Sequence, residues 1–255
     1  MTRFAQYSAF YDLLYADKDY AAEAAYVAAA LQTADPGVRT ILELGSGTGR
    51  HGRKLAALGF DVTGVELSPD MVAEAQRAPK SSQCAFACEV GDLRTWRAGR
   101  TFDAVISLFH VMSYQTRNED LKAAFGAAAE HLAPGGLFFF DVWHGPAVLA
   151  QRPEPRVKEV ADDRRRVRRD ATPALDAEAG TVTVTYAIDC EDLATGERFG
   201  FEEEHPMRYL FPTEVDLLAD ASGFSRVKSE EFLTGRPPSE ETWGVAYLMR
   251  KADRP

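Results

Sequence analysis

The stretch Ile41-Leu-Glu-Leu-Gly-Ser-Gly-Thr-Gly-Arg-His-Gly52 decides the fold of this chain. An apolar run that contains an acid, Glu43, breaks into glycines at alternate positions, Gly45, Gly47 and Gly49. Glycine accepts the positive φ angles of a tight turn and lets a ligand come close to the backbone. A β-strand that ends in such a turn and leads into a helix is typical of nucleotide and cofactor sites. The stretch therefore predicts a cofactor-binding turn at the end of the first strand of a sheet.

Strands and helices alternate around this turn, from about residue 39 to residue 142. Helical patterns separate β-rich runs that are almost continuously apolar, as are the strands of a parallel sheet covered on both faces. The predicted strands are residues 39–44, 61–67, 85–90, 102–108 and 137–142, and the helices are 49–58, 68–77 and 118–132. Ligands of such sheets bind beyond the carboxyl ends of the strands. We therefore expect the site just after residues 44, 67, 90, 108 and 142.

The segments on either side of this core have different patterns. Residues 7–32 show helical spacing with a break near residues 17–19, so residues 1–38 are predicted to form a helical lid on the core of residues 39–150. Residues 151–210 change to β-rich runs at 157–170, 181–190 and 197–210. We expect them to form an antiparallel β insertion after the fifth strand, which covers the substrate or joins the subunits of a homodimer. Residues 211–255 are predicted to complete the sheet with a helix and strands.

Composition narrows the class of partner. A net charge of −10 disfavours nucleic acid and anionic membranes. No apolar run reaches the roughly 20 residues that span a bilayer, and Met1–Gln6 lack the apolar core of a signal peptide. The cysteines Cys84, Cys88 and Cys190 lack metal-site spacing and indicate free thiols in a reducing compartment. We expect a cytoplasmic protein without a metal that acts on a small molecule.

The acid in the first strand bears on the choice of ligand. Like charges about 4 Å apart cost about 4 kcal/mol at an effective dielectric near 20, so Glu43 disfavours a pyrophosphate at the turn. S-adenosylmethionine (SAM) has an ammonium and a sulfonium group and no phosphate, and its carboxylate can bind glycine amides at a helix N-terminus. The pattern Gly47-x-Gly49-x-x-Gly52 also matches a dinucleotide site. The glycine turn starts at Gly45, directly after the strand, whereas this match starts two residues later, which weakens the alternative of an NAD-dependent oxidoreductase.

Two further acids follow neighbouring strands and fit other parts of SAM. Glu66 is expected to accept hydrogen bonds from the two ribose hydroxyls, a role that NAD sites share. Asp92 is expected to accept from the adenine amino group, with Leu93 or Trp96 against the ring, and an NAD site has no need of an acid there. The strand-end residues Leu67 and Leu108 belong to the same predicted cofactor site.

Taken together, the motifs ELGSGTG, VELS, GDL, FDAVIS and LAPGGL resemble, in order and spacing, the class I SAM-dependent methyltransferases. This resemblance covers about residues 39–142 and implies a Rossmann-like α/β sheet with helices on both faces. The leader Phe10–Tyr20, Ser113-Tyr114 and Asp141-Val-Trp143 are similar to the N-methyltransferases of nucleotide-linked amino sugars. That pattern often has two aromatic residues after the fifth strand, whereas here His144 follows Trp143.

The second resemblance implies transfer to the amine of a nucleotide-diphosphate amino sugar, with a small-molecule O-methyltransferase as the alternative. It also implies that Tyr15 or Tyr20 closes over the methionine end of SAM or over the substrate. A protein that binds SAM without catalysis is a further alternative. An assay over amines and hydroxyl compounds separates it from an enzyme.

Three residues after predicted strands are candidates for the base that removes the amine proton: His110, Tyr114 and His144. None has an evident orienting partner in the sequence, so we expect alignment of the reactants to dominate, with water as proton acceptor. The arginine-rich run of residues 162–170 is interpreted as a solvated edge strand. The alternative is contact with an anionic substrate such as a nucleotide diphosphate.

Overall fold

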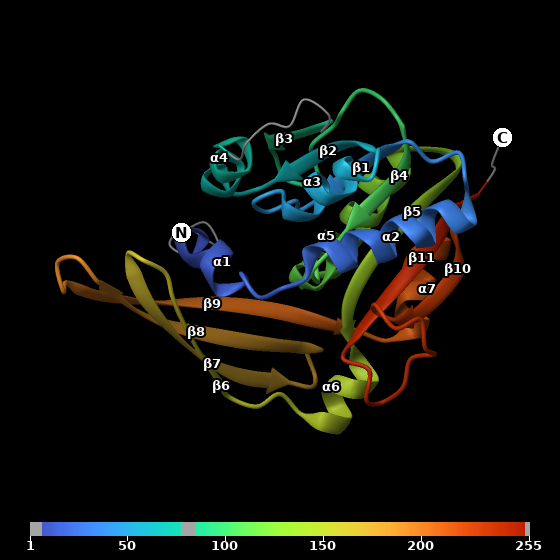
Figure 1. Cartoon of the computed structure of the whole chain (residues 1–255). Coiled ribbons are helices and arrows are strands. Elements are labelled where there is room, and N and C mark those ends of the chain that lie inside the picture. The colour runs from blue at the N-terminus through green and yellow to red at the C-terminus, as the bar shows by residue number, and fades with distance from the viewer. Residues whose placement is uncertain (1–6, 78–84, 253–255) are drawn as a thin grey trace.

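The computed structural model describes residues 7–77 and 85–252 (Figure 1). Strand β1 (Thr40–Leu44) lies inside the sheet and pairs in parallel with β2 (Asp61–Glu66) and β4 (Phe102–Ser107). Outside these strands, β3 (Phe86–Val90) pairs with β2 and β5 (Leu132–His144) pairs with β4, both in parallel. The parallel order β3-β2-β1-β4-β5 places all five carboxyl ends at one edge of the sheet.

Helices cover both faces of this sheet. Side chains of α2 and α3 pack on one face, and those of α5 and α7 pack on the other. The helices are α1 (Ser8–Leu14), α2 (Tyr20–Ala34), α3 (Arg50–Ala57), α4 (Pro69–Arg77), α5 (Asn118–Glu130), α6 (Gly145–Gln151) and α7 (Pro212–Ala221), with a 3-10 turn η1 at Val111–Tyr114. This arrangement confirms the predicted α/β fold class.

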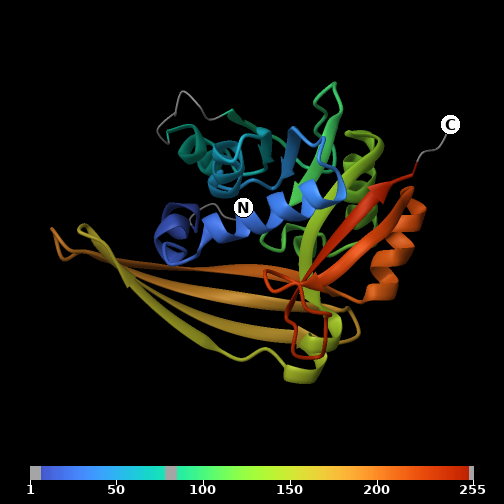
Figure 2. The ribbon, with the colours of Figure 1, turned by 45° about the vertical axis from the view of Figure 1, so that its right-hand side comes forward.

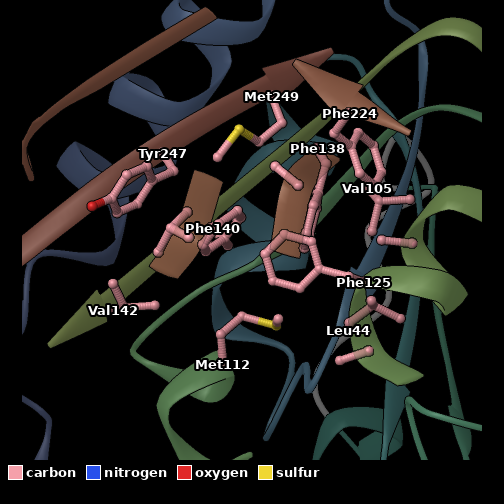
Figure 3. Packing of buried hydrophobic residues seen from close by; sticks show 14 of the residues in the cluster. Leu44, Val105, Met112, Phe125, Phe138, Phe140, Val142, Phe224, Tyr247 and Met249 are labelled. Carbon is pink, nitrogen blue, oxygen red and sulfur yellow. The ribbon is translucent and has the colours of Figure 1, made fainter. Parts of the chain in front are cut away.

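The face under α5 is filled by aromatic side chains (Figure 3). Phe125 of α5 meets Phe138 and Phe140 of β5 edge to face, with ring centroids 5.5 and 5.3 Å apart. Tyr247, the cross-strand partner of Phe140, stacks on it with ring centroids 5.4 Å apart. Burying a large apolar side chain contributes about 1.5–3 kcal/mol, so this cluster fixes β5 in the middle of the core.

Two further strands pair with β5, β11 (Gly244–Lys251) along most of its length and β9 (Arg198–Leu210) at its carboxyl end. β11 pairs antiparallel along one edge of β5 and carries β10 (Phe224–Glu231) on its outer side. On the other edge, β4 stops pairing at Phe140, and β9 pairs in parallel with Trp143 and His144. The segment after residue 150 is therefore attached at the edge where the carboxyl ends of the parallel strands lie.

This segment is an antiparallel ladder of β6 (Arg156–Ala161), β7 (Arg165–Asp176), β8 (Thr181–Asp192) and β9. The single strand expected over residues 157–170 is wrong, because the chain reverses between β6 and β7. The Asp162 carboxylate accepts hydrogen bonds from the backbone N–H groups of Arg164 and Arg165 at 2.9 and 2.8 Å. An aspartate that binds the backbone two and three residues on is a turn former, which the charge pattern concealed.

Helix α1 of the lid segment lies between the insertion sheet and the part of the core that contains α3, whereas α2 packs on the central sheet (Figures 1 and 2). Tyr7, Phe10 and Leu14 pack against Val167 and Ile188 of the insertion. The helical spacing of residues 7–32 and its break are confirmed by α1 and α2. The lid thus rests on the insertion sheet and faces the glycine turn.

One strand boundary expected from the sequence needs correction, and some of the residues discussed above lie outside the described ranges. β5 begins at Leu132, not at 137, because Leu132 already pairs with Phe102 ahead of an irregularity in the ladder. Cys88 and Cys190 are buried free thiols, whereas Cys84 and Met1–Gln6 lie outside the described residues. Within residues 7–77 and 85–252, no helix is both long enough and apolar enough to span a bilayer.

Candidate active site

A cavity of about 590 Å³ lies where the carboxyl ends of the parallel strands meet the lid and the insertion. Most of the predicted site residues line it, although their elements are far apart in the sequence. They are Tyr15, Tyr20, Gly45, Gly47, Glu66, Leu67, Asp92, Leu93, Leu108, His110 and Tyr114. Glu43, Gly49 and His144 do not line it.

The glycine turn forms one wall of the cavity. Gly45, Gly47 and Gly49 all have positive φ, of 73°, 55° and 74°. A Cβ atom on Gly45 would lie 2.5 Å from the side chain of Val111, and one on Gly49 would lie 2.6 Å from Phe86. Gly47 differs, because its nearest neighbour would be Met71 Sδ at 4.0 Å. The backbone at Gly47 is therefore open to a ligand, while Gly49 begins α3 behind the cavity.

Glu66 ends β2 beside this turn. Its carboxylate accepts hydrogen bonds from the backbone N–H groups of Gly47 and Ser68, both at 2.9 Å. Burial raises its pKa, and the backbone N–H groups of Ser68 and Gly47 oppose this shift. The carboxylate thus lies in a fixed orientation at the cavity wall, where its remaining lone pairs suit the hydroxyls of a ribose.

Glu43 is placed differently from the sequence expectation, behind the turn instead of beside the ligand. Side chains alternate along β1, and Glu43 points to the face that α3 covers, where it lies near Gly52. Its side chain is 1% exposed, and burial, with a smaller effect of Glu66, raises its pKa to about 8. At neutral pH it is therefore mostly protonated and uncharged, so it does not repel a phosphate at the turn.

Asp92 lines the cavity but already has a cationic partner. Both of its carboxylate oxygens bind the guanidinium of Arg94, at 2.9 and 2.5 Å, and Arg94 also contacts Asp120. The hydrogen bonds from Arg94 lower the pKa of Asp92. Of the two side chains expected against an adenine ring, Leu93 lines the cavity and Trp96 does not, because Trp96 stacks on His131 at 5.6 Å.

Aromatic rings of the lid, together with Phe109 just after β4, line another wall of the cavity. The rings of Tyr15 and Phe109 meet edge to face at 5.1 Å, and Tyr20 lies against His51 at 4.7 Å. The guanidinium of Arg50 lies 4.2 Å from the centre of the Tyr20 ring. Phe109 is a lining residue that the sequence did not single out. Faces of aromatic rings attract cations, and Lys18 Nζ likewise lies 4.2 Å from the centre of the Phe109 ring.

His110 has the orienting partner that was not evident in the sequence. Its Nδ1 lies 2.7 Å from Oδ2 of Asp141, and its backbone N–H also donates to that carboxylate at 3.1 Å. Asp141 is 2% exposed, and burial alone would raise its pKa, but the charge and hydrogen bonds of His110 outweigh burial and lower it. A histidine whose one ring nitrogen faces a buried carboxylate can use its other nitrogen as a proton acceptor.

The other two candidate bases are placed less favourably. Tyr114 lines the cavity, and its hydroxyl lies 3.2 Å from Nδ1 of His205, a buried histidine of β9. His144 is buried behind the cavity, where its Nδ1 lies 3.2 Å from the carbonyl oxygen of Thr242 and burial lowers its pKa. The expectation that His144 faces the ligand edge is therefore wrong, because its strand position turns it into the β5–β11 junction.

The end of the cavity beyond His110 is aromatic and apolar. Trp143 of β5 and Trp243, just before β11, both line it with ring centroids 5.7 Å apart. Tyr186 and Met207 of the insertion complete this end. Trp243 supplies a second aromatic residue, which the sequence did not place because it lies 100 residues after Trp143. The insertion therefore contributes to the far end of the cavity.

Comparison with known proteins agrees with this layout. Residues 41–136 match a family described as a methyltransferase domain. The dTDP-3-amino-3,4,6-trideoxy-alpha-D-glucopyranose N,N-dimethyltransferase of Streptomyces venezuelae is 33% identical over 230 residues, which are 89% of this chain and 92% of that relative. The structure of a SAM-bound amino pentose methyltransferase from Micromonospora echinaspora has a TM-score of 0.75 at 27% identity and covers 99% of both chains. A sugar N-methyltransferase from Streptoalloteichus sp. has a TM-score of 0.80 at 25% identity, over 97% of this chain and 93% of its own.

Proposed function

Because this chain belongs to the SAM-dependent N-methyltransferases of nucleotide-linked amino sugars, we propose that it methylates the amine of such a sugar. SAM is the methyl donor of this enzyme. The observation that favours an amine acceptor is the pair formed by His110, which lines the cavity, and the buried Asp141 beside it. An imidazole held by a buried carboxylate suits an acceptor that has to lose a proton.

The glycine-turn end of the cavity fits SAM. The open backbone at Gly47 leaves room for the cofactor, and Glu66 is positioned to accept from its ribose hydroxyls. Leu67 and Leu93 offer apolar surface to the adenine ring. Asp92, with its charge shared by Arg94, is the proposed acceptor for the adenine amino group.

The lid end of the same wall fits the charged part of the cofactor. Tyr15, Tyr20 and Phe109 present aromatic rings, which stabilise a sulfonium cation by about 0.5–2 kcal/mol depending on exposure. When bound, SAM supplies an electrophilic methyl group. The residues of the lid exclude water from it and fix its direction toward the acceptor end.

His110 is the proposed proton acceptor. With Nδ1 beside the Asp141 carboxylate, Nε2 is left for the acceptor amine. An ammonium has no lone pair, so one N–H bond has to break as the Nε2–H bond forms, which frees the nitrogen for attack on the methyl group. Alignment of nitrogen and methyl supplies the larger part of the acceleration, roughly 7–11 kcal/mol in well-oriented reactions. Trp143 and Trp243 provide the surface against which the sugar is held.

A panel assay with labelled SAM tests this proposal. It contains dTDP-linked amino sugars, the free amino sugars and small hydroxylated compounds without an amine. We expect label on the amine of the nucleotide-linked sugars, weaker labelling of the free sugars and none on the hydroxyl compounds. Label on oxygen alone would overturn the N-methylation proposal. Tight SAM binding with no transfer to any acceptor would instead favour a protein that binds SAM without catalysis.

A further inference from the structure

Arg169, in the run over residues 162–170, donates to tyrosines of the lid, whereas Arg166 and Arg168 of the same run pair with carboxylates. On β7, Arg166 and Arg168 point outward and form exposed ion pairs, such as that of Arg168 with Glu159 at 2.9 Å. Arg169 points to the inner face of the sheet, toward the lid. Its Nη1 donates to the hydroxyl of Tyr7 at 2.9 Å and to that of Tyr15 at 3.1 Å.

Aromatic rings enclose the Arg169 guanidinium on this inner face. Its Cζ lies 4.8 Å from the centre of the Tyr186 ring and 5.7 Å from that of Tyr15. The hydroxyl of Tyr7 also donates to that of Tyr15 at 3.2 Å. Tyr7, Tyr15 and Tyr186 all line the cavity, so Arg169 lies directly behind its tyrosine wall.

This position is costly for a cation. Within the described part of the chain, Nε of Arg169 is buried and has no hydrogen-bond partner. Burying a charge is unfavourable unless strong partners compensate for lost water, and neutral hydroxyls compensate less than a carboxylate does. The side-chain hydrogen bonds of Arg169 given above both go to tyrosine hydroxyls of the lid.

The opposite side of the lid is hydrogen-bonded to the glycine turn and to α3. The hydroxyl of Thr48, in the glycine turn, donates to Asp12 of α1 at 2.8 Å. Arg50 of α3 donates to the carbonyl oxygen of Tyr15 at 3.3 Å. Tyr15 is thus held through its carbonyl by Arg50 of α3 and through its hydroxyl by Arg169 of the insertion. It therefore connects α3 with the insertion sheet.

We propose that Arg169 is a positioning residue for cofactor binding, which holds Tyr15 over the cavity and so links the insertion to closure of the lid. A second cation of the insertion acts on the same segment, because Lys158 of β6 pairs with Asp17 at 2.7 Å. The proposal rests on the placement of the cofactor beside Tyr15 that is given under the proposed function. It requires no particular acceptor.

The expected change in SAM affinity depends on the fraction of molecules in which the lid is closed. A ligand that needs the closed form binds with an apparent Kd equal to its intrinsic Kd divided by the closed fraction. If loss of Arg169 leaves the lid closed in about a tenth of the molecules, the apparent Kd rises about tenfold. The affinity for SAM is therefore the quantity to measure, and it can be read without any methyl transfer.

The experiment is calorimetry of SAM binding to Arg169→Met and to its matched control Arg168→Met. Methionine keeps the apolar stem and removes the donors, and Arg168 is the neighbouring arginine on the outer face. We expect about a tenfold weaker Kd for Arg169→Met and less than about a twofold change for Arg168→Met. A Kd within twofold of wild type for folded Arg169→Met would overturn the proposal.

A double-mutant cycle with Tyr15→Phe separates positioning from a general loss of structure. Tyr15→Phe keeps the ring and removes only the hydroxyl that Arg169 holds. If Arg169 acts through that hydroxyl, the double variant binds SAM no more weakly than Arg169→Met. If the losses of SAM affinity in the two single variants multiply in the double variant, the proposal is contradicted. Should Arg169→Met fail to fold, the pair Tyr7→Phe and Tyr15→Phe in one chain replaces it, with the same tenfold loss expected and unchanged affinity as the contrary result.

These measurements are independent of the acceptor. Wild type that binds SAM but methylates no amino sugar would refute the proposed function and leave the role of Arg169 to be judged by the affinities. Conversely, unchanged affinities in variants that still methylate amino sugars would refute the role of Arg169 alone.

Discussion

Asp141 fixes His110 by two contacts, one to the ring and one to the backbone. Oδ2 lies 2.7 Å from Nδ1, and the backbone N–H of His110 donates to the carboxylate at 3.1 Å. Phe109 and His110 both have a φ of 63°, which is unfavourable for residues with a side chain. Such strain is common at functional sites, where the surrounding structure holds it in place. The contact gives His110 a defined orientation at the cavity.

If His110 removes the amine proton, His110→Ala should lower kcat by roughly 10²–10⁴-fold with little change in the affinity for SAM. Asp141→Asn should lower kcat by about tenfold or more, because the ring loses its charged partner. Single-turnover rates with a dTDP-amino sugar measure both effects. Tyr114→Phe is the comparison, and its loss should stay below about tenfold, since a neutral phenol is a weak proton acceptor. Losses below tenfold in His110→Ala would restore the expectation that water accepts the proton.

His144→Gln should leave kcat within about twofold of wild type, because the side chain does not line the cavity. Its effect should appear in stability at low pH. Burial lowers the pKa of His144, so the unfolded state takes up a proton that the folded state resists. The free energy of unfolding of wild type should therefore fall as pH drops below the ordinary histidine value of about 6.5, and this part of the fall should vanish in His144→Gln. Urea titrations across that range provide the measurement, and identical slopes in the two proteins would refute it.

Glu66→Ala should weaken SAM binding by about tenfold or more, because hydrogen bonds to a charged group contribute about 1.5–3 kcal/mol each. The turn itself should loosen as well, since Gly47 and Ser68 lose their common acceptor. Calorimetry gives the affinity, and Glu89→Ala at the partly exposed third strand serves as control. A change of less than twofold would mean that Glu66 only organises the turn.

Glu43→Gln should alter how stability depends on pH. Burial raises the pKa of Glu43 from 4.5 to about 8 in the folded state. Between these values the folded protein holds a proton that the unfolded chain has released, so the free energy of unfolding falls as pH rises. Above about pH 8 this contribution levels off. Each pKa unit is worth about 1.4 kcal/mol, so the slope between about pH 5 and 8 should amount to a few kcal/mol in wild type and be flatter in Glu43→Gln. Equal slopes by urea denaturation would show that Glu43 is ionised when folded.

Gly45→Ala should destabilise the protein more than Gly59→Ala does. Both glycines have positive φ, of 73° and 99°, where a side chain costs roughly 1–2 kcal/mol. A Cβ at Gly45 would also approach Val111 to 2.5 Å, whereas one at Gly59 would meet nothing within 4 Å. The midpoints of urea denaturation should reflect this difference. Equal shifts would indicate that Val111 moves aside at little cost.

The sequence by itself determined the order of elements and the position of the cofactor turn. Apolar strands, helical spacing and glycines are local signals, and a parallel sheet brings its carboxyl ends to one edge whatever the loops are. This is why the sequence alone assigns residues as distant as Gly45, Glu66, Asp92 and His110 to one site. Even so, local patterns missed the turn at Asp162, where a side chain binds the backbone of the residues that follow.

Only the tertiary structure decided which neighbours these residues have. It turned Glu43 to the face under α3 and His144 into the β5–β11 junction, because the direction of each side chain depends on strand register. It paired His110 with Asp141 across 31 residues and brought Trp243 beside Trp143. It also separated Arg169 from Arg168, which are adjacent in sequence but lie on opposite faces of β7. Burial, partner and charge are properties of contacts between distant segments, and those contacts form only when the chain has folded.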